Sequence, residues 1–256
     1  MKTLGAVNLY DFYFNGKYLS SMGGIVAGKD GFKEYSLLPS RDTKTQRTIG
    51  SDETFILNSK LNPREFSVPV LFQDDGGIEM RDIAGWLDSE DAQDFYFKDD
   101  TIKLKAKLNN KEIMLSTFSS FAGLTEIPFI AYDPFFYEIT PTQYTFTTTQ
   151  VFTNIGNKIC IPKIEITTSA SATIIVQLLQ NSVAYYSFSM TGLNGYCCID
   201  SKAFSVVDSN GLTLFDKYTK ILGDTIFPMI KTGVNTISVT GSNITSAKLT
   251  PNFRWI

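Results

Sequence analysis

Two stretches decide the fold: SKLNPREFSVPVLF at residues 59–72 and AYDPFFY at residues 131–137. The first alternates as a half-buried β-strand does. One side of this strand is predicted to take its large apolar residues: Phe66, Val68, Val70 and Phe72. Arg64, Ser67 and Pro69 are predicted near or on the other side. The second stretch is an aromatic block interrupted by Asp-Pro, a pair that ends a strand and turns the chain. Neither stretch contains a catalytic constellation.

Composition changes along the chain near residue 140. Residues 1–140 contain 15 Lys or Arg and 21 Asp or Glu, whereas residues 141–256 contain only 8 and 5. The second part holds 29 Ser or Thr instead. Such a replacement of charge by hydroxyl groups predicts two domains, 1–140 and 141–256, in a chain of 256 residues. A single low-charge β fold is the alternative.

The first domain is predicted to be β-rich with one helix. Asn15-Gly16 is a two-residue hairpin signal. A helix is predicted over about 78–88, where Ile83, Trp86 and Leu87 form an apolar stripe. Residues 32–38 and 54–57 are expected to be short strands on either side of a polar loop. Gly23-Gly24 has no phosphate-binding context and is assigned to a flexible loop.

The second domain is predicted to be a β-sandwich. Short apolar segments recur every ~8–12 residues between turn signals, which is typical of such folds. The expected strands are 159–166, 173–179, 184–190, 195–200, 205–207, 234–240 and 247–250. The fold class is therefore mainly β throughout.

The side-chain inventory argues against an enzyme. The chain has no histidine, which excludes Ser-His-Asp and Cys-His arrangements and histidine-bearing zinc sites. The pairs Asp74/Asp75 and Asp99/Asp100 would suit a two-carboxylate glycosidase, but each lies in turn sequence where Asp is favoured for backbone hydrogen bonding. No calcium-loop, Walker A or dinucleotide fingerprint is present. We therefore predict no cofactor, no metal and no catalytic residue.

The three cysteines are expected to be buried free thiols. Cys197 and Cys198 are consecutive strand residues that point to opposite faces, so they should not bond each other. A disulfide from Cys160 to one of them is the alternative. Asn8 and Asp11 interrupt the apolar N-terminal stretch, so a secretory signal is not expected. We expect folding in a reducing cytoplasm.

Three features are candidates for binding. The polar loop 39–52 and its border carry charges of both signs that would suit contacts with a neighbouring subunit, or simply solvation: Arg41, Asp42, Lys44, Arg47, Asp52 and Glu53. Lys103, Lys105 and Lys107 form a row that would contact phosphate or, more simply, solvate a strand. Aromatic residues of the sandwich would stack on sugars or fill the core: Tyr185, Tyr186, Tyr196, Tyr218 and Trp255.

The order of motifs along the chain resembles the distal tail proteins of bacteriophages with long non-contractile tails. The motifs in the first half are FYFNG (12–16), LNPREFSVPVLF (61–72), IAGWL (83–87), FKDD (97–100) and YDPFFY (132–137). Those in the second half are FTNIGN (152–157), IPKI (161–164), CID (198–200), FPMIKTGVNTI (227–237) and PNFRW (251–255).

This resemblance implies an N-terminal ring-forming domain with one helix and a C-terminal galectin-like sandwich. It implies a homo-hexameric ring, single or as a back-to-back pair, that joins the tail tube protein to the tail-associated tip protein. Receptor-binding or baseplate proteins would dock on the sandwiches, and DNA would pass only in transit. The protein would reside at the tail tip of the virion after assembly in the host cytoplasm, without contact with a membrane. A carbohydrate-binding sandwich protein that contacts the host cell wall is the alternative function.

Overall fold

The computed structural model describes residues 11–27, 38–47, 54–73, 79–109, 113, 116–119 and 122–256. The N-terminal stretch, residues 32–37 of the expected strand 32–38, Asp52, Glu53 and the Asp74/Asp75 pair lie outside the described residues. The contacts divide the chain into two compact units, Met1–Phe136 with Ile256, and Tyr137–Trp255. Each unit has its own hydrophobic core.

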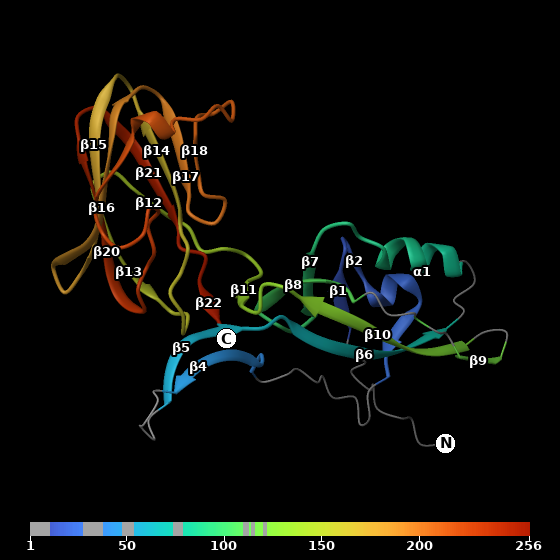
Figure 1. Cartoon of the computed structure of the whole chain (residues 1–256). Helices are drawn as coiled ribbons and strands as arrows, with labels where there is room; N and C mark the ends of the chain where they lie inside the picture. The colour runs from blue at the N-terminus through green and yellow to red at the C-terminus, as the bar shows by residue number, and fades with distance from the viewer. Residues whose placement is uncertain are drawn as a thin grey trace, which may run out of the picture. The chain divides into compact units, whose positions relative to one another are not determined.

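The N-terminal unit is built on a sheet of order β2-β1-β7-β8-β10-β6-β3, with β9 paired to β10 (Figure 1). Its strands are β1 (Phe12–Phe14), β2 (Lys17–Tyr18), β3 (Gly24–Val26), β6 (Arg64–Gln73), β7 (Gln93–Phe97), β8 (Ile102–Leu108), β9 (Ser116–Ser119) and β10 (Ala122–Ala131). Its core is aromatic. The rings of Phe95 and Phe129 lie 5.0 Å apart between centroids, and Phe12 lies 5.2 Å from Phe95.

The predicted hairpin and the predicted helix are both present and are linked by hydrogen bonds. β1 and β2 pair across Asn15-Gly16, whose positive φ angles of 43° and 80° suit a tight hairpin turn. Helix α1 (Met80–Leu87) is shorter than predicted. Trp86 Nε1 donates to the carbonyl of Phe14 at 2.7 Å, and Asn15 Nδ2 donates to the carbonyl of Trp86 at 2.8 Å. The helix is therefore fastened to the hairpin by hydrogen bonds as well as by apolar packing.

The stretches 59–72 and 131–137 come together in the fold. β6 pairs antiparallel with β10 over their full length, which places Arg64 opposite Ala131. The prediction that Arg64 lies near the polar side of β6 is wrong. Its guanidinium is buried, donates through Nε to the carbonyl of Pro134 at 2.7 Å and lies 4.9 Å from the ring centre of Phe136. The Asp-Pro block thus ends β10 and covers the arginine at the start of β6.

Two loop predictions are wrong in the described residues. Part of the polar loop is strand β4 (Arg41–Arg47), which pairs with β5 (Thr54–Leu61) in a two-stranded sheet of its own. Gly24 lies in β3 rather than in a flexible loop, and a Cβ there would lie 2.3 Å from Cδ1 of Leu19. A glycine is required where backbone and core approach so closely.

Residues 137–255 form a sandwich of two five-stranded sheets, ordered β12-β21-β14-β17-β18 and β13-β20-β15-β16-β19. The strands of the first are β12 (Tyr144–Phe146), β14 (Lys163–Thr168), β17 (Tyr196–Asp200), β18 (Ser205–Val207) and β21 (Ile244–Thr250). Those of the second are β13 (Thr149–Asn154), β15 (Ala172–Gln180), β16 (Val183–Leu193), β19 (Tyr218–Leu222) and β20 (Gly233–Gly241). β11 (Phe136–Glu138) leads into this unit, and β22 (Arg254–Trp255) ends it. Two short 3-10 helices complete the described elements, η1 (Leu19–Met22) in the first unit and η3 (Phe215–Lys217) in the second.

All three cysteines are free and buried, as predicted. Burial raises the pKa of Cys160 to about 11 and that of Cys197 to about 12. The native state therefore keeps protons that an unfolded thiol, with an ordinary pKa of 9.0, releases. The stability contributed by the neutral buried thiols is complete below about pH 9 and is lost as the pH rises toward 11.

We expect the free energy of unfolding to fall between pH 9 and pH 11. Urea denaturation at several pH values in this range measures the slope. Buried tyrosines contribute to the same slope, so the matched comparison is the double variant Cys160→Ala/Cys197→Ala. Its slope should be shallower than that of the unchanged chain. Parallel slopes would show that the thiols are not the titrating groups.

Candidate interaction surface

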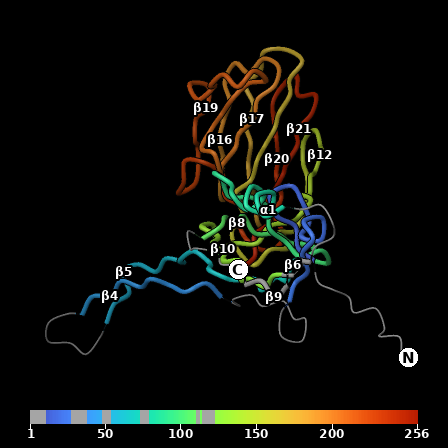
Figure 2. The backbone as a smooth tube through the Cα atoms, turned by 90° about the vertical axis from the view of Figure 1, so that its right-hand side faces the viewer, coloured from blue at the N-terminus to red at the C-terminus, as the bar shows by residue number. Residues whose placement is uncertain are grey.

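The hairpin of β4 and β5 contributes no buried side chain to either core. Every residue of β4 is exposed, and β5 is exposed from Thr54 to Lys60. Figure 2 shows the backbone tubes of the two strands running alongside each other. An isolated two-stranded sheet is marginally stable in water. A hairpin of this kind is typical of an arm that becomes ordered against a partner.

An apolar run lies on the hairpin and is more than half exposed to solvent. Phe55, Ile56 and Leu57 are 53%, 69% and 63% exposed. The pairing register shifts between Lys44 and Thr45, and this irregularity sets Leu57 outside the regular pairs. Three consecutive large apolar side chains on one exposed strand are a costly surface for a monomer in water. We call Phe55, Ile56 and Leu57 the apolar run of the hairpin.

The described strands of the hairpin are cationic. Arg41, Lys44, Arg47 and Lys60 outnumber Asp42, which gives a net charge of +3. Arg41, Asp42, Lys44 and Arg47 are all exposed on β4. The structure thus places four of the six predicted contact residues on one projecting strand. Asp52 and Glu53, the other two, lie outside the described residues and lower the sequence charge of 41–61 to +1.

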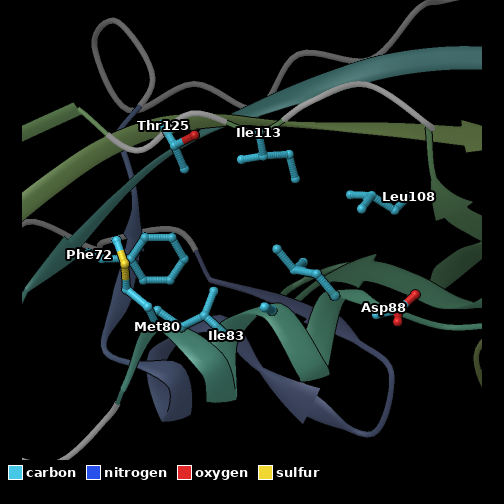
Figure 3. A pocket seen from close by; sticks show the side chains of 9 residues that line it. Phe72, Met80, Ile83, Asp88, Leu108, Ile113 and Thr125 are labelled. Atoms are coloured by element: carbon cyan, nitrogen blue, oxygen red, sulfur yellow. The ribbon is translucent and has the colours of Figure 1, made fainter.

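A second apolar surface lies in the N-terminal unit between helix α1 and the sheet. It is a pocket of about 470 Å³ lined by Phe72, Met80, Ile83, Ala84, Leu87, Asp88, Leu108, Ile113 and Thr125. Figure 3 shows Met80 and Ile83 rising from the helix toward a space bordered by Phe72, with Ile113 and Thr125 on the opposite side. Met80 is 61% exposed at its rim. We call this pocket the α1 groove.

Acidic side chains surround the helix that forms the α1 groove. Residues 79–91 carry Glu79, Asp82, Asp88, Glu90 and Asp91 against Arg81 alone, a net charge of −4. Arg81 is 2.9 Å from Glu79, so it neutralises one of these carboxylates. Asp82 accepts a hydrogen bond from the backbone N–H of Glu79 at 3.2 Å and stabilises the start of the helix. All five acidic side chains are exposed.

The lysine row of β8 does not form an open cationic strip. Lys103 Nζ and Lys105 Nζ lie 2.9 and 2.7 Å from the carboxylate oxygens of Asp94, on the neighbouring strand. Burial alone would raise the pKa of Asp94, but the hydrogen bonds from Lys105 and Lys103 lower it below its ordinary value. Lys107 Nζ donates to the carbonyl of Glu90 at 2.8 Å. These pairs support a structural role for the row. Lys103 and Lys105 share the negative charge of Asp94, so the row attracts a phosphate less strongly than three unpaired lysines would.

Of the two carboxylate pairs, Asp99/Asp100 lies in a turn, as predicted, and Asp74/Asp75 lies outside the described residues. Asp99 and Asp100 belong to the turn between β7 and β8, where the N–H of Asp100 donates to the carbonyl of Phe97 at 2.9 Å. Among the described residues, no three His, Cys, Asp or Glu side chains gather as metal ligands would. Within the same ranges, no helix has the length and apolar character to span a bilayer.

The aromatic residues of the sandwich are part of its packing. Tyr186 and Tyr218 are buried, and their hydroxyl oxygens lie 2.7 Å apart, each also within hydrogen-bond distance of the carbonyl of Ile226. Each hydroxyl has one hydrogen, so the pair makes two of these three hydrogen bonds at a time. Half-buried Tyr185 donates to Asn235, and half-buried Tyr196 donates to Glu165. Trp255 packs against the core. None of the five predicted residues is among the exposed side chains, and each takes part in the packing or the hydrogen bonds of the sandwich.

Sequence reasoning identified the charges of β4 but missed both apolar surfaces. The residues 54–57 carry a strand signal, yet the pattern holds no sign that their side chains stay exposed. The α1 groove joins residues that are far apart in the sequence, from Phe72 to Thr125. Only the apolar stripe of the helix gave a local signal, since Ile83 and Leu87 both line the groove.

Comparison with known proteins finds likenesses to phage tail proteins. Residues 7–117 match the model of a family described as phage tail protein N-terminal domain. No curated protein matches the chain.

Solved structures share the fold over nearly the whole chain. The crystal structure of the SPP1 Dit protein, described as a paradigm of the hub adsorption apparatus in phages that infect Gram-positive bacteria, matches with a TM-score of 0.72 at 19% identity. That match covers 94% of this chain and 98% of the other. A chain of the phage p2 baseplate in its activated conformation matches with a TM-score of 0.54 at 8% identity, over 94% and 97% of the two chains. The mainly β fold with one helix and a sandwich is thus the fold of these tail components.

Proposed function

We propose that this chain, whose residues 7–117 match a phage tail protein N-terminal domain and whose fold is that of Dit, is a structural hub of a phage tail tip or baseplate. The observation that carries this proposal is the coverage of the likeness. Both units of the chain align with nearly all of a protein described as a hub of the adsorption apparatus. Its role is assembly, and no chemistry is assigned to it.

The hub acts as a homo-hexameric ring, alone or as a back-to-back pair of rings. A ring requires heterologous contacts, in which one surface of a subunit meets a different surface of the next. The β4–β5 hairpin supplies one such surface, with Arg41, Asp42, Lys44 and Arg47 exposed on β4. Asp52 and Glu53, between the two strands in the sequence, complete the proposed set of inter-subunit contacts.

The ring joins the tail tube protein to the tail-associated tip protein, and the sandwiches carry receptor-binding or baseplate proteins. DNA passes through its centre. Residues 1–140 have a net charge of −6, and an acidic wall repels a phosphate backbone rather than retaining it. The protein is placed at the tail tip of the virion, after assembly in the host cytoplasm. Nothing in this role requires a cofactor, a metal or a membrane.

Native mass spectrometry of the purified chain is expected to give six subunits, or twelve for paired rings. Replacing two exposed cations by Arg41→Ala/Arg47→Ala should weaken assembly more than folding, because charged side chains at a rim set association while exposed positions contribute little to stability. The expected result is a lower fraction of hexamer with an unchanged unfolding midpoint. Lys202→Ala/Lys220→Ala in the sandwich is the matched loss of two cations and should leave the hexamer as it is. A monomer at high concentration, combined with binding to glycans, would instead support the carbohydrate-binding alternative.

A further inference from the structure

We infer that the α1 groove of one subunit binds the apolar run of the β4–β5 hairpin from a second copy of this chain. This inference rests on the proposed ring and names the two surfaces that meet in it. The hairpin is the projecting partner and the groove is the receiving one. The contact is heterologous, so its repetition does not stop at a dimer, and it gives a ring where the rotation between subunits closes.

The apolar content of the two surfaces agrees. The hairpin offers three large side chains that are more than half exposed, Phe55, Ile56 and Leu57. The groove has a volume of about 470 Å³ and is lined mainly by apolar side chains, with Asp88 and Thr125 as its polar residues. A cavity of this size holds a few large side chains, and clefts lined by apolar residues with few polar groups are typical binding sites. Ile83, Leu108 and Ile113 pack against the core on one side, whereas Met80 at the rim and the apolar run of the hairpin are exposed.

The charges around the two surfaces are opposite in sign. The hairpin has a net charge of +3 on its described strands and of +1 over residues 41–61 of the sequence, and residues 79–91 around the groove have a net charge of −4. Asp88 lines the groove itself, and Glu90 and Asp91 follow it closely in the sequence. Complementary charges at the rim of an apolar contact steer association and fix its orientation. A hairpin–hairpin or groove–groove contact would place like charges together, which favours the head-to-tail pairing of two copies.

Crosslinking of two introduced cysteines tests which surfaces meet. Ile56→Cys and Met80→Cys both replace exposed side chains, one on the hairpin and one at the rim of the groove. The three natural cysteines are buried, so a short bis-maleimide should react with the introduced thiols. We expect the double variant I56C/M80C to give a ladder of covalent oligomers that ends at six. Co-expressed single variants should give dimers only when both are present.

The matched control replaces Ile56 by another site of equal exposure. Val183 in the sandwich is 69% exposed, as Ile56 is, and V183C/M80C should give no ladder. Crosslinked monomer that has consumed both thiols would show that a subunit fills its own groove, which overturns the inference. A hexamer in native mass spectrometry without any ladder would also overturn it while leaving the proposed function standing. If native mass spectrometry shows no hexamer, both the proposed hexameric ring and this inference are wrong.

A charge placed in the groove gives a second measurement that does not depend on crosslinker geometry. Met80→Glu should raise, by tenfold or more, the protein concentration at which half of the hexamer is dissociated, whereas Met80→Leu should leave this concentration unchanged. If M80E leaves the hexamer unchanged and only prevents incorporation into tails, the groove binds a different tail protein and the inference is wrong.

Discussion

The variant Ile56→Asp/Leu57→Asp is expected to exist as a folded monomer at concentrations where the unchanged chain is a hexamer. Both side chains are more than 60% exposed in the subunit, so their replacement should change the free energy of unfolding by no more than ~0.5 kcal/mol. In the ring each would bury apolar surface, a gain of about 1.5–3 kcal/mol per side chain. Loss of both weakens every contact by about 3 kcal/mol or more, which is over a hundredfold in affinity.

The matched control for this prediction is another pair of adjacent exposed apolar residues on a strand. Ile221 and Leu222 on β19 are 56% and 44% exposed, and I221D/L222D should keep the hexamer. Sedimentation velocity and native mass spectrometry measure the oligomer, and denaturation measures folding. If the I56D/L57D variant still forms the hexamer, the apolar run of the hairpin does not contribute to the ring contacts.

Most strands of the sandwich could be predicted from the sequence because their signal is local, whereas β12, β13 and β19 were not among the expected strands. The expected strand 173–179 is contained in β15, which the structure places at Ala172–Gln180. Alternate residues of β15 are buried, as the alternation predicts. The same holds for β6, where Val68, Val70 and Phe72 are all buried. An alternating pattern predicts burial correctly when one face of the strand packs on a core and the other face is exposed to solvent.

Two strands of the N-terminal unit could not be predicted because their reasons are not local. β4 has no apolar alternation, and it is a strand because it pairs with β5. β10 contains Pro128, which argues against a central strand. The fold tolerates this proline because the pairs of β10 with β8 are Phe129 with Leu108 and Ile130 with Lys107, so Pro128 need not donate there. Pairing geometry decided both cases, and a single sequence does not contain it.

Some features of the candidate interaction surface could likewise be predicted from the sequence, and others could not. Charges on β4 were predictable, since polar residues between two apolar segments must lie at the surface. The exposure of Ile56 was not predictable, because a strand signal such as TFIL normally indicates burial. The α1 groove depends on how helix and sheet pack, and it leaves Met80 exposed although Leu87 on the same helix is buried. The chemistry of the surface was thus partly evident, while its shape needed the fold.

A buried asparagine holds the first loop of the sandwich together. Asn154 at the end of β13 is buried. Its Nδ2 donates to the carbonyls of Lys158 and Lys231 at 3.0 and 3.2 Å, and its Oδ1 accepts from the N–H of Gly156 and the thiol of Cys160 at 3.0 and 3.2 Å. Aspartate has no amide hydrogens and alanine has no polar atom, so neither can make all four contacts.

Asn154→Ala is therefore expected to lower the free energy of unfolding of the sandwich by about 3–5 kcal/mol, because it leaves several buried polar groups without partners at ~1–3 kcal/mol each. Urea denaturation measures the loss, with the exposed Asn210→Ala as the control that should stay within ~0.5 kcal/mol. Asn154→Asp separates this network from simple packing. A carboxylate facing two carbonyl oxygens should have a raised pKa in the folded state, so the variant should be most stable at acidic pH and lose stability as the pH rises toward neutrality. Equal stability of N154D and the unchanged chain at pH 7 would show that the four hydrogen bonds do not hold the loop.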